Sequence, residues 1–413
     1  MNPEKPKKKR VTVIVGSGFS AALTSGERPI LGSKPLPTLN NLTESVLAHM
    51  KFLQGHDGAL QFSVSTVKQS VALLEKNVGR PENERYSFEE LLSLLAIESS
   101  LSQGSSSPIL ADLPGANPQI LPCVLFCLSH LFATRLSYDG SHRANRNFWY
   151  KVNDPERARE FKEGVWRLVD EHEVTFISFN YDGLIEAFLD FWIGDADQQH
   201  RGYHYLVELS HALPIASPEH VFARPDMRDF AQISRPPLVL KPHGSIHFFQ
   251  LRAELKGLTG GLTMAGLHPR LDIGFNPATG QRDIPDIRFW EFADPAPVII
   301  PPLLSKQSYL GGDYFQAMLR LIVEAVQQAE RVLVIGFSLP PSDLHVCAAF
   351  EAINWTGKKL GLVFREGPSD DTEKHWRRVA GGQAISMTIN TGIPLESESA
   401  VNGFWDKVRT FLE

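Results

Sequence analysis

Short, uninterrupted apolar runs recur along the chain and end at glycine or polar residues. The first is VTVIV at 11–15, which is rich in β-branched residues and stops at Gly16. Runs of this kind are typical of strands that are buried on both faces of a parallel sheet. Similar runs lie at 174–178 (VTFIS), 238–241 (LVLK), 297–300 (PVII), 331–335 (RVLVI) and 359–364 (KLGLVF). We therefore expect these six buried strands to form one sheet.

Helical patterns separate the later runs. Over 313–330 the apolar residues recur at helical spacing, and Asp313 is a candidate N-cap. A strand followed by a helix and another strand is typical of parallel α/β proteins. The pattern thus predicts an α/β fold with a Rossmann-like parallel sheet and helices on both of its faces.

The stretch 41–170 differs, because its long apolar periodic patterns have no matching buried strands. Ser87 and Glu90 form an S-x-x-E capping box ahead of a leucine-rich run, which predicts the start of a helix. We interpret 41–170 as a helical module inserted after the first βα unit, within a single unit that spans 1–413.

Two further stretches, 190–235 and 250–295, are rich in Pro, Gly, Asp and His and lack sustained periodicity. We expect them to be long surface connections. Loops of this length are uncommon in compact domains unless they are functional or partly disordered.

The composition narrows the class of protein. With 43% hydrophobic and 21% charged residues, it is ordinary for a globular protein. The formal net charge of −6 argues against the basic surface that non-specific duplex binding needs. No window reaches the roughly 18 apolar residues of a membrane span, and Met1–Arg10 is too polar for a signal peptide. We therefore expect a cytoplasmic protein that contacts neither membrane nor nucleic acid directly.

The first motif with chemical content, GSGFSA at 16–21, fits the form G-x-G-x-x-G/A and directly follows a predicted strand. Glycines here let backbone amides approach a pyrophosphate, and the following helix N-terminus favours its negative charge. The alternative is a tight turn that binds nothing. The acidic residue that ordinary Rossmann enzymes carry about 20 residues later is replaced by a loop containing Pro35 and Pro37. The candidate diphosphate contacts are Gly16, Ser17, Gly18, Phe19 and Ser20.

Two polar motifs follow later strands. FNYD at 179–182 carries Asn180 and Asp182, and KPHGS at 241–245 carries His243. Ligands of open parallel sheets lie outside the carboxyl ends of the strands, and a histidine suits proton transfer near neutral pH. The alternatives are a helix cap at FNYD and a structural histidine. A metal pair of His243 and His247 is disfavoured, because Gly244 makes a helix unfavourable and no third ligand is evident.

The fourth motif, GFSLPPSD at 336–343, follows the run RVLVI. Gly336, Ser338 and Asp343 are candidate contacts to a phosphate or ribose. A plain capping turn, with Ser342 or Asp343 as the N-cap of the next helix, explains the motif equally well.

Taken together, GSGFS, FNYD, KPHGS and VIGFSLPPSD resemble, in order and strand-end context, the motifs of the sirtuin superfamily. They look most like its bacterial sirtuin-like branch, many of whose members destroy NAD in anti-phage defence. The resemblance covers 11–343. It implies a sirtuin-type fold in which NAD lies across the carboxyl edge of the sheet, with GSGFS at the diphosphate.

The resemblance also implies roles for individual residues. Asn180 would lie beside the nicotinamide ribose, Asp182 would help to hold the carboxamide, and His243 would be the catalytic histidine. Ser338 of the GFS turn would contact the cofactor. More weakly, Val363, Phe364 and Arg365 end a strand where the family meets the adenosine.

The chain departs from the protein-deacylating sirtuins in two respects. Those enzymes usually carry two Cys-x-x-Cys pairs that hold a structural zinc, and Cys123, Cys127 and Cys347 cannot build that module. We therefore expect no zinc. The GIPDFR-like loop of the deacylases is replaced by KPLPTLNNL, in which only Pro37 is a loose match.

The predicted function is that of an NAD glycohydrolase, which splits NAD into nicotinamide and ADP-ribose as the effector of a bacterial anti-phage defence system. The alternatives are an NAD-dependent protein deacylase or ADP-ribosyltransferase, and a non-catalytic sensor of NAD or ADP-ribose. Regulation by homo-oligomerisation or by a partner is expected, because an unrestrained NADase would harm its own cell. A HerA-like ATPase or an Argonaute-type protein would be consistent with the family.

Overall fold

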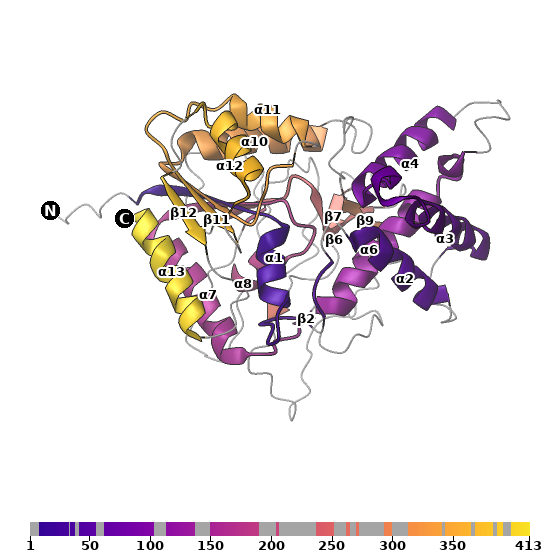
Figure 1. Cartoon of the computed structure of the whole chain (residues 1–413), viewed down its shortest axis with the longest axis horizontal. Coiled ribbons are helices and arrows are strands. Elements are labelled where there is room, and N and C mark those ends of the chain that lie inside the picture. Colours follow the sequence, from indigo (N-terminus) through magenta and orange to yellow (C-terminus); the bar gives the residue numbers. More distant parts are fainter. Residues whose placement is uncertain are drawn as a thin grey trace.

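A parallel seven-stranded sheet forms the centre of this α/β protein (Figure 1). Strand β1 (Arg10–Val15) lies between β10 (Arg331–Ile335) and β3 (Glu173–Ser178), and the strand order is β12-β11-β10-β1-β3-β5-β4. The remaining strands are β4 (His204–Tyr205), β5 (Leu238–Leu240), β11 (Lys359–Phe364) and β12 (Met387–Asn390). The computed structural model describes residues 8–32, 34–37, 41–54, 62–102, 113–136, 149–189, 204–205, 237–251, 262–264, 270–271, 293–299, 313–340, 343–364, 368–382, 386–390 and 398–413.

The order of the strands reverses at β1. The chain passes from β1 to β3 and β5 on one side, and later to β10, β11 and β12 on the other. Apart from the short edge strand β4, this is the order of doubly wound α/β proteins. The loops that follow β1 and β10 therefore start side by side and lead away to different helices. In open sheets a crevice opens at such a reversal, so the topology itself indicates where a ligand would lie.

Five of the six apolar runs form strands of this sheet, as predicted. The prediction for PVII at 297–300 is wrong. Its described part belongs to β9 (Ala293–Ile299), which pairs antiparallel with β6 (Gly244–Leu251) in a separate three-stranded sheet, β7-β6-β9. Pro295 and Pro297 cannot donate ladder hydrogen bonds, which suits the edge position of β9 and not a central strand.

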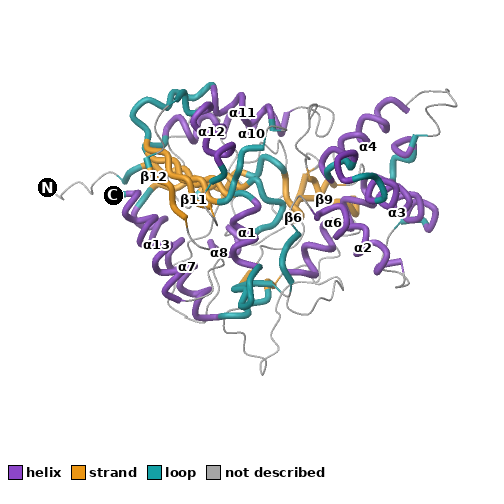
Figure 2. The backbone as a smooth tube through the Cα atoms, viewed as in Figure 1, coloured by secondary structure: helices purple, strands orange, loops and turns teal. Residues whose placement is uncertain are grey.

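Helices cover both faces of the main sheet (Figures 1 and 2). One face carries α10 (Asp313–Gln328), α11 (Leu344–Glu351) and α12 (Asp370–Val379). The other carries α1 (Ser17–Thr24), α7 (Pro155–Glu171), α8 (Leu184–Leu189) and α13 (Glu398–Leu412). None of the helices in the described ranges combines the length and the apolar character needed to cross a membrane.

A group of helices lies to one side of the sheet (Figure 1). It consists of α2 (Leu42–Gln54), α3 (Val64–Val78), α4 (Phe88–Ser102) and α6 (Ile120–Leu136), with short 3-10 turns at Glu82–Glu84 and Pro114–Ala116. At the start of α4 the predicted capping box is confirmed, because Ser87 N donates to Glu90 Oε2 (2.8 Å) and Glu90 N donates to Ser87 Oγ (3.2 Å). We call these four helices the side bundle.

The side bundle is shorter than the module expected at 41–170. Its helices contact one another, and α6 also contacts β9. Helix α7, within the expected range, packs instead against α13, α8 and β3. Asp154 caps α7 by accepting from Arg157 N (3.0 Å), so the helix begins at Pro155. The helix is strongly amphipathic, and its apolar face packs toward the main sheet.

Most of the predicted long connections at 190–235 and 250–295 lie outside the described residues. The described parts of these ranges are strands. They comprise β4, β7 (Leu262–Met264) and β8 (Arg270–Leu271), which pairs with β2 (Trp149–Tyr150), together with the end of β6 and the start of β9.

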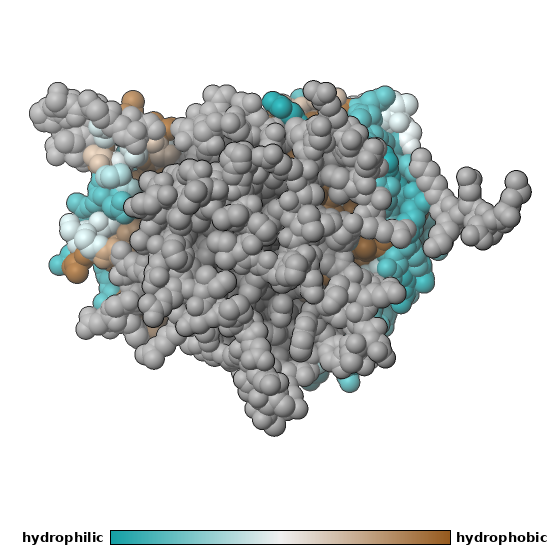
Figure 3. Space-filling model, turned by 180° about the vertical axis from the view of Figure 1, so that it is seen from behind, coloured by the Kyte–Doolittle hydropathy of each residue, from teal (hydrophilic) through white to brown (hydrophobic). Residues whose placement is uncertain are grey.

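Large apolar side chains reach the surface mainly on and beside the side bundle. Seen from behind, the described surface at the α13 end is largely hydrophilic (Figure 3). Among the described residues, the exposed large apolar side chains of this region are Phe52, Val64, Tyr86, Ile97 and Leu101.

An aromatic cluster joins the helices on the α7 face. Phe161 of α7 contacts Phe19 of α1 (ring centroids 5.9 Å apart) and Phe188 of α8 (4.8 Å). It also contacts Phe404 (5.9 Å) and Trp405 (5.2 Å) of α13. Because one fully buried ring contacts three other helices, its packing fixes how this layer is assembled.

We predict that Phe161→Ala lowers the free energy of unfolding by about 3–5 kcal/mol, since it leaves a cavity among four aromatic rings. Phe52→Ala is the matched control, because Phe52 is 56% exposed and its loss should change stability by less than about 0.5 kcal/mol. Urea denaturation of both variants measures the difference. Equal losses would contradict the central role of Phe161.

Candidate functional site

Two glycine turns meet where the strand order reverses. Gly16, which follows β1, donates its N–H to Ile335 O of β10 (3.0 Å), and Gly18 N donates to Gly336 O (3.0 Å). A Cβ atom on Gly16 would lie 2.6 Å from Gly336 O, so no side chain fits between the turns. Gly336 itself has a φ of +63°, which glycine adopts without strain. The two turns thus form one backbone-to-backbone contact.

A cleft opens beside this contact and encloses about 750 Å³ of space, part of it open to solvent. Of the residues predicted for the site, nine line the cleft: Gly16, Ser17, Ser20, Asn180, Asp182, His243, Gly336, Ser338 and Asp343. The four motifs identified in the sequence therefore meet at one place, at the carboxyl ends of β1, β3, β5 and β10.

Two predicted contacts do not line the cleft. Phe19 is 4% exposed and packs in the aromatic cluster against Phe161. The N–H of Gly18 donates to Gly336 O. The backbone of Gly18 therefore lies close to the second turn and not to the space of the cleft. The alternative interpretation of the motif, a tight turn, accounts for Gly18, whereas buried Gly16 and exposed Ser17 line the cleft at the N-terminus of α1.

Asn180 is held by the first turn. Its Nδ2 donates to Gly16 O (2.9 Å) and to Ser20 Oγ (2.8 Å). Because a carbonyl oxygen can only accept, the bond to Gly16 O fixes which end of the amide is the nitrogen. Asn180 is 7% exposed and lines the cleft, so its amide plane is set in place before any ligand arrives.

Asp182 lines the cleft and also binds the start of the next helix, the alternative that the sequence left open for FNYD. Its Oδ2 accepts from Ser20 Oγ (2.6 Å), and its Oδ1 accepts from Leu184 N (3.0 Å) at the start of α8. Both carboxylate oxygens thus bind groups of the protein itself. Asp182 holds Ser20, which in turn accepts from Asn180, so the three side chains form one chain of hydrogen bonds.

His243 lies on the turn between β5 and β6. Its Nε2 is 3.3 Å from Asp343 Oδ1, and the two side chains are 5% and 1% exposed. The ring of Phe179 meets the imidazole edge to face, at 5.1 Å and 72°. Asp343, predicted as a contact to the cofactor or as a helix cap, therefore lies against the histidine.

A buried ion pair supports the floor of the site. Lys241 Nζ lies 3.3 Å from Glu186 Oε1, and both side chains are fully buried. The ammonium also donates to Asp182 O (2.5 Å) and to Ser178 Oγ (3.3 Å). These bonds join the ends of β3 and β5 to α8. Breaking such a pair leaves an uncompensated buried charge, which costs about 3–5 kcal/mol.

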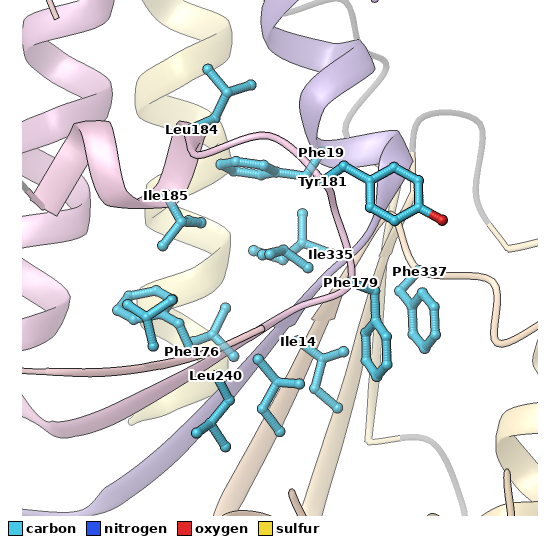
Figure 4. Close-up of a cluster of buried hydrophobic side chains, with 14 of the residues drawn as sticks. Ile14, Phe19, Phe176, Phe179, Tyr181, Leu184, Ile185, Leu240, Ile335 and Phe337 are labelled. Carbon is cyan, nitrogen blue, oxygen red and sulfur yellow. The ribbon is translucent and has the colours of Figure 1, made fainter. Parts of the chain in front are cut away.

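Sequence reasoning missed several residues of the cleft. Phe179 and Phe337 stack at 4.0 Å with their planes 2° apart (Figure 4). Behind them, Trp376 of α12 donates its Nε1–H to Phe337 O (3.1 Å). Aromatic residues at strand ends are a weak signal in a sequence, since the same residues are common in cores. The cleft is also lined by residues of the side bundle and of the segment before it, namely Leu42, Glu89 and Phe132 together with Leu36 and Pro37.

The cysteines lie away from the cleft. Cys123 and Cys127 are buried one turn apart on α6, and the hydrogen bond between their thiols lowers the pKa of Cys123 and raises that of Cys127. Burial raises the pKa of Cys347 on α11. In the described ranges, no three His, Cys, Asp or Glu side chains gather into a possible metal site.

The chain matches no protein-family model, and no curated protein matches it. The chemical groups of the cleft are an imidazole beside a carboxylate, a fixed amide, and a helix N-terminus beside a glycine turn.

We predict that Gly336→Ala lowers stability more than Gly357→Ala. Both glycines have positive φ, so both substitutions carry about 1–2 kcal/mol of backbone strain. A Cβ on Gly357 meets nothing within 4 Å, whereas one on Gly336 would lie 2.5 Å from Phe19 N. Forcing the two turns apart should add about 1–3 kcal/mol, measurable by urea denaturation. Equal losses would show that the close approach is not needed.

Proposed function

We propose that this chain is an NAD glycohydrolase, which uses water to split NAD into nicotinamide and ADP-ribose. The observation that carries the proposal is the convergence of Asn180, His243 and Ser338 on one cleft beside the N-terminus of α1. The choice of NAD as the substrate rests on the resemblance of the four motifs to those of sirtuin-like proteins.

The groups of the cleft suit a dinucleotide. A helix N-terminus preceded by a glycine turn favours a pyrophosphate, and Gly16 and Ser17 occupy that position. Asn180 and His243 line the same cleft and are proposed to bind the nicotinamide ribose. Ser338, exposed in the turn after β10, is proposed as a further contact to the cofactor.

The reaction needs little more than orientation and a base. Water attacks C1′ of the ribose, the bond from C1′ to the pyridinium nitrogen breaks, and its electron pair neutralises the departing nicotinamide. The transition state resembles an oxocarbenium ion, as in glycoside hydrolysis. Asn180 positions the ribose and the water, and His243 accepts the proton that the water gives up. Asp182 acts indirectly by holding Ser20 against Asn180.

The resemblance also suggests the setting in which NAD is destroyed. We propose that the chain serves as the effector of a bacterial anti-phage defence system, in which NAD loss is restrained until infection. Purified chain should therefore be assayed with NAD alone and then with candidate partners.

We predict that Asn180→Ala and His243→Ala each reduce nicotinamide release by at least about 100-fold, the range expected for losing an orienting or proton-transfer group. Chromatography of NAD, nicotinamide and ADP-ribose measures the rate, and the two products should appear in equal amounts. Asn402→Ala and His375→Ala are matched controls, since both residues lie away from the cleft. Thermal melting checks that each variant is folded.

Full activity in both site variants would refute the assignment. NAD loss that requires an acylated peptide or a protein acceptor would favour a deacylase or an ADP-ribosyltransferase. A thermal shift with NAD and no cleavage would favour a sensor.

A further inference from the structure

Asp343 occupies the N-cap position of α11 but does not use its side chain as a cap. Its backbone N–H donates to Pro340 O (2.9 Å), and its C=O accepts from Cys347 N (2.9 Å) as an N-cap carbonyl should. No cap hydrogen bond is made by its carboxylate. At the N-caps of α3, α7 and α12, by contrast, the side chains of Ser63, Asp154 and Ser369 all accept from a backbone N–H.

An aspartate that caps a helix typically contributes about 1 kcal/mol. Asp343 forgoes that contribution and instead places Oδ1 3.3 Å from His243 Nε2, across the gap between the β10 and β5 ends of the sheet. The side chain of Asp343 is 1% exposed, so its carboxylate is almost fully desolvated at this contact. Burying a carboxylate is costly unless a partner compensates, and the imidazole lies in the position to do so.

The imidazole is held from a second direction. Phe179 packs edge to face against it, and Phe179 is itself stacked on Phe337. The backbone around His243 is also fixed, because Gly244 N donates to Lys241 O (2.9 Å) and Gly244 has a φ of +73°. With both the ring and the backbone constrained, Nε2 is held facing the carboxylate of Asp343.

We propose that Asp343 is a positioning residue for His243: its carboxylate accepts the Nε2–H, fixes the neutral tautomer with the lone pair on Nδ1, and stabilises the imidazolium that forms when His243 takes a proton. The same arrangement of histidine and carboxylate orients the base in many hydrolases. The consequence for the reaction rate rests on the proposed function, whereas the pairing of the two side chains does not.

Other titratable groups surround His243, and each has its own setting. Lys241 is paired with Glu186, and Asp182 accepts from Ser20 and Leu184 N. The Tyr181 ring centroid lies 6.4 Å from that of the imidazole, and Glu89 and Asp182 line the same cleft. Lys241, Glu186 and His345 lie on the neighbouring elements, the turn after β5, α8 and α11. A change confined to Asp343 leaves all of them in place, so its effect on His243 reports this one contact.

The test is Asp343→Asn, which keeps the shape of the side chain and removes its charge. The pKa of the His243 imidazole is measured by nuclear magnetic resonance on ¹⁵N-histidine-labelled chain, with His243→Gln used to assign the signal among 14 histidines. Asp371→Asn is the matched control, since it removes the same charge from a side chain that is 89% exposed. Thermal melting of each variant establishes that it is folded.

We expect the pKa of His243 to fall by about one to two units in Asp343→Asn, because a nearby carboxylate favours the charged imidazole. Asp371→Asn should leave it unchanged. Since the base must be neutral, the acid limb of the pH profile of nicotinamide release should move to lower pH by the same amount. At neutral pH the rate should drop by at least about tenfold, as the tautomer is no longer fixed.

An unchanged or raised pKa of His243 in Asp343→Asn would overturn the inference. So would a neutral His243 that carries its proton on Nδ1 in the unaltered chain, a measurement that needs no variant. If the unaltered chain releases no nicotinamide at any pH and yet the pKa falls as expected, the pairing stands and the proposed function fails.

Discussion

The contact between the turns after β1 and β10 is the constraint on which the site depends. The strand order reverses there, so the two segments start together and then lead to α1 and α11 on opposite faces of the sheet. Because Gly16 and Gly336 have no side chains, the backbones of the two turns can contact each other at the point where the segments separate. The cleft opens directly beside the contact. Asn180 is tied to it through Gly16 O, so the position of the fixed amide follows from the position of the turns.

Much of the fold can be predicted from the sequence, because burial on both faces leaves an uninterrupted apolar run. This rule found β1, β3, β5, β10 and β11. It misassigned β9, since an apolar run does not reveal which partner a strand takes, although Pro295 and Pro297 argue for an edge. It also missed β12, a four-residue edge strand in which Thr388 and Asn390 interrupt the apolar pattern.

The location of the site could be predicted better than its internal bonds. Parallel strands bring their carboxyl ends to one edge, so polar motifs after several strands, such as Asn180 and His243, must gather there. Spacing along the chain says nothing of which side chains then pair. Asp182 binds Ser20, and Asp343 faces His243, because of distances between elements that are far apart in sequence. The wall formed by Glu89 and Phe132 depends in the same way on how the side bundle sits.

The hydrogen bond from Trp376 to Phe337 O connects the cleft to helix α12, which lies in the outer layer of the molecule. Helix α12 contributes no residue to the cleft, yet its buried indole holds the backbone of the segment that carries Ser338 from behind. The exposed side of the same helix bears the ion pair of Arg377 with Glu373. Anything that displaced α12 by binding this outer side would also shift the segment that carries Ser338, so the shape of the cleft can be changed from outside it.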